Sequence, residues 1–254
     1  MNRTGNTIVI TGGGSGIGEG LAEAFHNLGN QVVIAGRRKE VLDRVTTAHP
    51  GMKSLTLDVS SAASIRDFAN RVEREFPATN VLINNSGIMR PENLTAEPIN
   101  LANSEEIIAT NLLGPIRLSA AMLPLLRRQP RSTIMMVSSG LAFVPMSITP
   151  TYCATKAAIH SYAQSLRRQL ANSTTEVLEL IPPYVATNLM GDNQAHDSRA
   201  MPLADFIAEV MQILQTQPSA TEICVERVKG LRFAEKTGQY DNLFRGLNAS
   251  TPEA

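Results

Sequence analysis

Four side chains in the stretch SSGLAFVPMSITPTYCATK could transfer a proton: the hydroxyls of Ser138 and Ser139, the phenol of Tyr152 and the amine of Lys156. Tyr152 and Lys156 are four residues apart, so on a helix they lie on one face. The pKa of a free tyrosine is about 10, and a nearby cation lowers it by favouring the phenolate. Such a tyrosine could exchange a proton with a substrate oxygen, but this stretch by itself does not decide between that function and the alternative. The alternative is an exposed helical pair and two serines that merely end a strand.

A second chemical motif is the glycine-rich sequence TGGGSGIG at residues 11–18. It follows an apolar strand pattern and precedes a helical one, a context in which glycines let backbone N–H groups approach a pyrophosphate. A hydrolase elbow around Ser15 would need glycine where Ile17 stands, and no Walker lysine follows, so esterase and ATPase activities are disfavoured. The motif predicts a dinucleotide site built on three glycines: Gly12, Gly16 and Gly18.

The second apolar strand ends in the sequence AGRRKE. A site that selects NAD usually carries an acidic residue at this position to bind the ribose 2′-hydroxyl. Here Gly36 is followed by Arg37 and Arg38, and a guanidinium group can form charge-assisted hydrogen bonds with a 2′-phosphate. We therefore expect NADP(H) rather than NAD(H), with two solvated arginines at a helix start as the alternative.

Short apolar segments alternate with helical patterns along the chain. The expected strands lie at Thr7–Thr11, Gln31–Gly36, 54–59, 80–85, 132–139 and Thr175–Ile181, with a last apolar segment around EICVERV. Helical patterns follow the first three, a long helix is expected to end near Arg128, and others begin near Thr151 and Pro202. Continuously apolar strands are typical of a parallel sheet buried on both faces.

These repeated strand–helix units predict an α/β fold: a doubly wound Rossmann-type parallel sheet with helices on both faces, formed by residues 1–254 as a single domain. In such sheets ligands bind beyond the carboxyl ends of the strands, near the point where the strand order reverses. The motifs above all lie in or just after loops at those ends, so we expect them to meet.

Composition excludes several classes of protein. The chain has 23 basic and 23 acidic residues, a balance that argues against a nucleic-acid partner. We expect no membrane segment, because no apolar run reaches about 18 residues, and the start lacks a signal-peptide core, so a cytoplasmic location is expected. Cys153 and Cys224 have no metal-ligand spacing with the histidines, and no metal is expected. His160 is predicted to be a packing or surface residue.

Taken together, the motifs resemble those of the short-chain dehydrogenase/reductases over nearly the whole chain. The glycine loop, Asp58 in LDV, NNSG at residues 84–87 and the serine thirteen residues before Tyr152 occur in the family's order and spacing. The resemblance implies four catalytic residues, Asn111, Ser139, Tyr152 and Lys156. In it, Tyr152 is the general acid/base, and Asn111 holds a water of a proton relay behind Lys156. It also implies a cofactor site formed by Gly12, Ser15, Gly16, Ile17, Gly18, Arg37, Arg38, Asp58, Val59, Asn85, Ser86, Gly87, Tyr152, Lys156, Val185 and Thr187.

Three positions depart from the family pattern. Ser15 stands where NADP-preferring members often carry a basic residue, which places more of the selectivity on Arg37. Ser86 replaces alanine, and Pro183 replaces the glycine of the family's P-G-x-V-x-T, while Val185 and Thr187 match and are expected to contact the carboxamide. The ending GLRFAEKTGQYDNLFRGLN resembles a bacterial branch of the family labelled with the lipoteichoic-acid D-alanylation operon.

The expected substrate is a mid-sized, partly hydrophobic ketone, aldehyde or secondary alcohol. Its pocket would be lined by apolar residues after the fifth and sixth strands, unless these simply pack on the core: Leu141, Phe143, Val144, Met146, Tyr184, Leu189 and Met190. Residues 187–203 are polar and contain glycine, which is typical of a mobile lid. The resemblance implies a homodimer or homotetramer. A nucleotide-sensing protein without turnover on the same fold is the alternative function.

Overall fold

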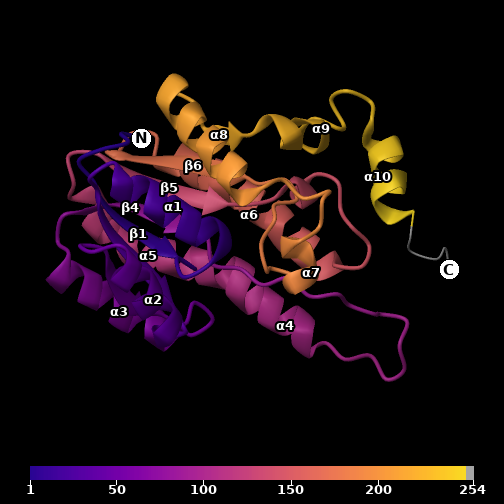
Figure 1. Cartoon of the computed structure of the whole chain (residues 1–254), viewed down its shortest axis with the longest axis horizontal. Helices are drawn as coiled ribbons and strands as arrows, with labels where there is room; N and C mark the ends of the chain where they lie inside the picture. Colours follow the sequence, from indigo (N-terminus) through magenta and orange to yellow (C-terminus); the bar gives the residue numbers. More distant parts are fainter. Residues whose placement is uncertain (250–254) are drawn as a thin grey trace.

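The computed structural model describes residues 1–249 and shows a parallel sheet of seven strands (Figure 1). The strand order is β3-β2-β1-β4-β5-β6-β7. Strands are added on one side of β1 up to β3 and on its other side from β4 onward, so the order reverses between β1 and β4. The predicted fold class, a doubly wound parallel sheet, is confirmed. The strands are β1 (Thr7–Thr11), β2 (Gln31–Gly36), β3 (Lys53–Thr56), β4 (Thr79–Asn84), β5 (Ser132–Val137), β6 (Thr175–Ile181) and β7 (Glu222–Cys224).

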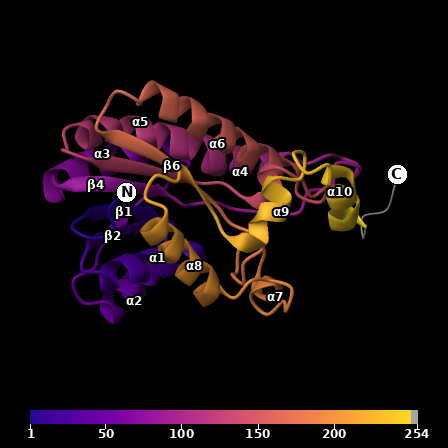
Figure 2. The ribbon, with the colours of Figure 1, turned by 90° about the horizontal axis from the view of Figure 1, so that it is seen from above.

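Helices cover both faces of the sheet (Figure 2). One face packs on α1 (Gly16–Asn27), α2 (Lys39–Ala48) and α8 (Leu203–Thr216), and the other on α3 (Ala62–Glu75), α5 (Gly114–Arg127) and α6 (Pro150–Gln169). Within β1, Ile8 and Ile10 belong to the first core and Val9 to the second, because successive strand side chains point to opposite faces. Both faces are therefore apolar, which explains the continuous apolar runs.

Three strands are shorter than the sequence predicts, and one of them is β5, which ends at Val137 rather than at Ser139. β3 ends at Thr56, because Asp58 turns the chain by accepting hydrogen bonds from the backbone and the hydroxyl of Ser60. The last strand, β7, has three residues. Three short helices that the periodicity did not predict are α7 (Asp192–Ala195), α9 (Lys229–Arg232) and α10 (Tyr240–Asn248).

The long helical run Ala102–Arg127 consists of α4 (Ala102–Ile108), a π-helical turn, η1 (Ala109–Leu113), and α5. Within residues 1–249 it is the one helix long and apolar enough, by length and composition, to cross a membrane. The sequence predicted no membrane segment, because no continuous apolar run reaches about 18 residues. Leu118, Met122 and Leu126 are nevertheless buried in the core shared with α3 and the sheet, which is the packing of a core helix.

Candidate active site

The glycine loop occupies the carboxyl end of β1, and its backbone requires glycine at the predicted positions. Gly12 and Gly16 have φ values of +67° and +54°, in the left-handed region that L side chains rarely adopt. A Cβ at Gly18 would lie 2.3 Å from the carbonyl oxygen of Gly12, so the start of α1 can approach the loop only without a side chain. The spacing of the three glycines is therefore a requirement of the turn itself.

The loop after β4 is bonded to the glycine loop across the point of strand reversal. The backbone N–H groups of Asn85 and Ser86 both donate to the hydroxyl of Thr11, each at 3.0 Å. The side-chain amide of Asn85 donates to the carbonyl of Thr11 at 2.9 Å. Asn85 thus holds the glycine loop in place with the side chain that the resemblance assigned to the cofactor.

Charged residues that follow β2 and β3 lie close to one another, near the start of α2. The guanidinium of Arg37 is 56% exposed and lies 3.8 Å from the carboxylate of Glu106. The pKa of Asp58 is lowered, first by its hydrogen bond from the Ser60 hydroxyl and also by the charge of Arg37. Arg38 is exposed at the N-cap of α2. Arg37 and Asp58 are therefore brought together, with Arg37 available to a ligand.

Two residues of the implied catalytic set, Asn111 and Lys156, meet beside Gly87. A Cβ at Gly87 would lie 3.4 Å from Asn111 Oδ1 and 3.8 Å from Lys156 Nζ. Asn111 lies in the π-helical turn, a feature frequent at functional sites, and its side chain bonds both backbone groups of Ile88, at 2.9 and 2.8 Å. Gly87 thus leaves room where a side chain would reach these two polar groups.

The other members of the set come from the end of β5 and from α6. Lys156 Nζ donates to the carbonyl of Val137 at 2.8 Å. The hydroxyl of Ser139 accepts from the backbone N–H of Leu141 at 3.1 Å and also interacts with Tyr152. All four side chains are buried, so the site offers two hydroxyls, an amine and an amide in a region of low dielectric.

Burial changes the ionisation of Tyr152 and Lys156 in opposite directions. The pKa of Tyr152 is raised by burial, an effect that the Ser139 hydroxyl partly offsets. Burial lowers the pKa of Lys156 to about 8. The negative charge of Glu179 acts in the opposite direction and raises it. The sequence predicted a lowered tyrosine pKa. In this structure desolvation is the largest effect on the Tyr152 pKa, and the Lys156 Nζ, which lies 5.5 Å from the ring centre, donates its hydrogen bond to the Val137 carbonyl.

Only part of the predicted apolar wall gathers beside Tyr152. Leu141, Met146 and Met190 pack on the cluster that contains it. Phe143 does not join this cluster: its ring packs edge-on against His160, with centres 4.7 Å apart. Tyr184 and Leu189 are exposed, and Val144 is fully buried but belongs to none of the three core clusters. The sequence missed the other apolar members, which follow β4 or lie on α4 and α6: Ile88, Met89, Ile107 and Cys153.

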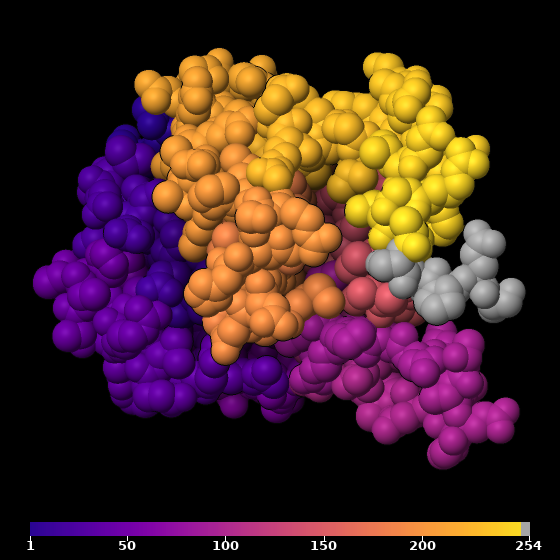
Figure 3. Space-filling model, turned by 45° about the vertical axis from the view of Figure 1, so that its right-hand side comes forward, coloured from indigo at the N-terminus to yellow at the C-terminus, as the bar shows by residue number. Residues whose placement is uncertain are grey.

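Residues 187–203 fold over the carboxyl edge of the sheet, between the N-terminal half and the C-terminal helices (Figure 3). Gln194 is buried and organises this segment. It donates to the Val185 carbonyl at 2.8 Å and the Thr187 hydroxyl at 3.2 Å, and accepts from the Met190 backbone at 3.0 Å. Thr187 also lies against Gly16, where an added Cβ would come within 3.3 Å of its methyl group. The segment after β6 therefore meets the glycine loop.

The remaining predicted cofactor residues also lie at this edge of the sheet. Ser15 is the exposed N-cap of α1, and Ile17 packs on the first core. Val59 is buried beneath the π-helical turn, since a Cβ at Gly114 would lie 2.7 Å from the Val59 carbonyl. Sequence reasoning missed Gln194 and Glu179 altogether. A buried glutamate inside an apolar strand pattern was the available signal for Glu179.

Comparisons with known proteins agree on one family. The sequence model of the family described as short chain dehydrogenase matches residues 6–198. A Bacillus subtilis (strain 168) protein described as uncharacterized oxidoreductase DltE is 37% identical over 251 residues, which cover 98% of each chain. This similarity supports the branch suggested by the chain's ending.

Two solved structures show the same fold. A short chain dehydrogenase from Burkholderia cenocepacia in complex with NADP has a TM-score of 0.81 and 22% identity, over 99% of this chain and 100% of that one. One from Burkholderia phymatum in complex with NAD has a TM-score of 0.79 and 18% identity, over 100% and 99% of the two chains.

Proposed function

Because this chain belongs to the short chain dehydrogenase family, we propose that it is an oxidoreductase that transfers hydride between NADP(H) and a carbonyl compound or secondary alcohol. The observation that supports the proposal is a chain of close contacts among four buried polar residues. Asn111 and Lys156 lie beside Gly87, Lys156 Nζ lies 5.5 Å from the ring centre of Tyr152, and Tyr152 interacts with Ser139. A nucleotide sensor would have no need of these buried polar groups, each of which costs free energy to bury.

The residues at the edge of the sheet fit a dinucleotide. Gly12 and Gly16 form a cradle that side chains would obstruct, and the N-terminus of α1 favours a pyrophosphate. Gly87, at the same end of the sheet, has no side chain to fill the space beside the Lys156 amine. When bound, the nicotinamide supplies or accepts the hydride. In this proposal the glycine loop binds the pyrophosphate, and Val185 and Thr187 hold the carboxamide.

The chain's own residues handle the proton. The Tyr152 hydroxyl donates a proton to the substrate oxygen during reduction and accepts it during oxidation. The Ser139 hydroxyl hydrogen-bonds the same oxygen and orients it. Its interaction with Tyr152 places the two groups side by side. Lys156, as an ammonium, favours the phenolate that forms when the proton leaves. The raised pKa of Tyr152 keeps this group protonated at neutral pH, as an acid for reduction requires.

The test of this function is a panel of ketones and aldehydes, assayed with NADPH and with NADH by the loss of reduced-nicotinamide absorbance. We expect turnover of partly hydrophobic carbonyls, because Leu141, Met146 and Met190 lie beside Tyr152. Binding of NADPH without turnover of any compound would favour the sensor instead. A preference for large anionic substrates would contradict the proposed substrate class.

We expect Arg37→Asp to shift the preference from NADPH toward NADH by about 10- to 100-fold, the range set by the loss of one charge-assisted hydrogen bond. The guanidinium is exposed beside Asp58, where a 2′-phosphate would meet it. The measurement is the ratio of kcat/KM for the two cofactors. Arg245→Asp in α10 is the matched control, with the same change of charge and no expected change in the ratio. An unchanged ratio in Arg37→Asp would remove Arg37 from the cofactor site.

Residues 187–203 are proposed to act as a substrate lid, and Gln194→Ala tests this. The variant loses three hydrogen bonds, each contributing about 1 kcal/mol, so the segment should open more often. We expect several-fold faster proteolysis within the segment and a raised KM. Asn193→Ala, a change at the exposed neighbouring residue, is the control. Cleavage at the wild-type rate would show that Gln194 does not hold the lid.

A further inference from the structure

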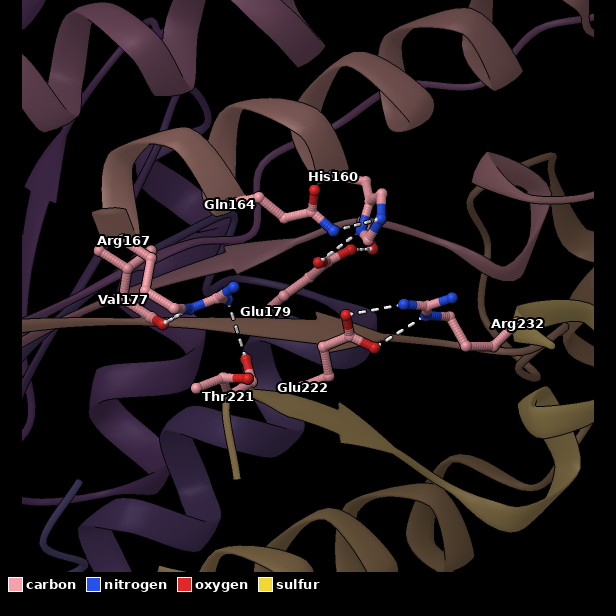
Figure 4. A network of polar contacts seen from close by, with 9 residues as sticks. His160, Gln164, Arg167, Val177, Glu179, Thr221, Glu222 and Arg232 are labelled. Carbon is pink, nitrogen blue, oxygen red and sulfur yellow. Dashed lines mark hydrogen bonds and ion pairs between the residues drawn. The ribbon is translucent and has the colours of Figure 1, made fainter. Parts of the chain in front are cut away.

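A second buried polar group lies behind the proposed catalytic residues, on β6 and α6. Glu179 is fully buried in the middle of β6. Its Oε1 accepts from the hydroxyl of Ser138 at 2.5 Å. Figure 4 shows its other contact, in which Oε2 lies 2.8 Å from Nδ1 of His160. Burying a carboxylate away from water costs free energy unless hydrogen bonds and an opposite charge compensate it.

Both hydrogen-bond partners of Glu179 are linked to Lys156, one through a neighbouring backbone carbonyl and the other through the helix. Ser138 follows Val137, whose carbonyl accepts the hydrogen bond from Lys156 Nζ. His160 lies one helical turn after Lys156 on α6, so the two side chains share a face. The Glu179 carboxylate therefore lies against the same turn of α6 and the same strand end as the buried amine.

The same residues also have the composition of a cation site, since ligand atoms of His160, Glu179 and Glu222 lie within 4.8 Å of one another. Their hydrogen bonds argue against that use. Arg232 binds both oxygens of Glu222, at 2.7 and 2.9 Å, while Ser138 and His160 take the two oxygens of Glu179. The guanidinium of Arg232 therefore already supplies to Glu222 the positive charge that a bound cation would bring.

The charges around Glu179 can then be assigned to pairs. Glu222 is neutralised by Arg232, and the raised pKa of Cys224, about 11, keeps that thiol neutral at neutral pH. Among the described residues, the amine of Lys156 and the imidazole of His160 are then the basic groups that face Glu179 without a carboxylate of their own. The groups that face it from the elements packed around it are thus Lys156 and His160 on α6, Glu222 and Cys224 on β7, and Arg232 on α9.

We propose that Glu179, held by Ser138 and His160, is a positioning residue whose buried negative charge keeps the Lys156 side chain in its ammonium form. This rests on the proposed oxidoreductase function, in which that ammonium favours the Tyr152 phenolate. Burial alone drives Lys156 toward the neutral amine, and Glu179 is the charge that opposes this. Glu179 touches no reacting atom in this scheme and acts only through Lys156.

The sign of the pH effect follows from the charge. In wild type, the Lys156 ammonium is lost as pH rises through about 8. In Glu179→Gln the supporting charge is gone, so the ammonium should be lost about one pH unit or more lower. Carbonyl reduction should then fall off at correspondingly lower pH, with activity retained on the acid side.

The experiment follows Lys156 directly, by an NMR pH titration of isotope-labelled lysine Cε resonances, with Lys156→Met to assign the signal. We expect a lower midpoint in Glu179→Gln and a wild-type midpoint in Glu222→Gln, a matched control whose charge Arg232 already neutralises. The pH profile of reductase activity should shift in parallel. A Lys156 midpoint in Glu179→Gln equal to that of wild type would overturn the proposal.

Two further measurements keep the test decisive. If circular dichroism shows that Glu179→Gln does not fold, Glu179→Asp draws the carboxylate back by one methylene and should lower the midpoint by a smaller amount. An unchanged midpoint there would overturn the proposal in the same way. An absence of turnover on the carbonyl panel would contradict the proposed function. The NMR titration needs no substrate, so it would still decide whether Glu179 sets the charge of Lys156.

Discussion

Replacing Tyr152 by phenylalanine is expected to lower turnover of any responsive carbonyl by about 10²- to 10⁴-fold, the usual contribution of a general acid. The change removes one hydroxyl and leaves the ring, which is buried among Met89, Ile107 and Cys153. Packing should therefore persist, as should NADPH binding, because the glycine loop lies on other elements. The measurements are kcat with saturating NADPH and the NADPH Kd by fluorescence.

Tyr162→Phe is the matched control for this prediction. Tyr162 lies on the same helix, α6, and packs on the second core, away from Ser139 and Lys156. Its loss of a hydroxyl should leave kcat unchanged. Wild-type turnover in Tyr152→Phe would show that another group supplies the proton, and a matching loss of NADPH binding would show that the substitution disturbs the site as a whole.

Substituting alanine for Gly18 should both destabilise the protein and abolish tight cofactor binding. The new methyl group would lie 2.3 Å from the Gly12 carbonyl oxygen and 2.5 Å from the Asn85 amide nitrogen. The first is backbone, so α1 or the glycine loop must shift. Overpacking of this kind costs about 1–3 kcal/mol, which corresponds to a Tm lower by several degrees. Thermal unfolding and NADPH titration measure the two effects.

Gly230→Ala provides the control, because nothing lies within 4 Å of a Cβ at that position in α9. There alanine should be neutral or slightly stabilising, since glycine is the poorer helix former. A Gly18→Ala variant that binds NADPH as tightly as wild type would contradict the assignment of this loop to the cofactor. An unchanged Tm would contradict the close approach of α1.

Much of the fold could be predicted from the sequence because the relevant signals are local. β1, β2 and β6 were predicted with their observed bounds, since each is a short run rich in aliphatic residues. β7 and α10 were harder: a three-residue strand and a helix without fully buried residues leave weak patterns. The order of the strands is not a local property, and only the tertiary structure gives it.

The sequence alone determined the fold class and the glycine loop, because spacing along one chain segment specifies turns and helix faces, and its resemblance to a family supplied the proposed catalytic residues. Tertiary structure decided what depends on distance through space. It brought Glu179 against His160 on the helix that carries Lys156, turned Phe143 toward His160 and buried Tyr152 so that its pKa rises. Desolvation and charge pairing depend on residues far apart in sequence, and no local pattern records which of them will meet.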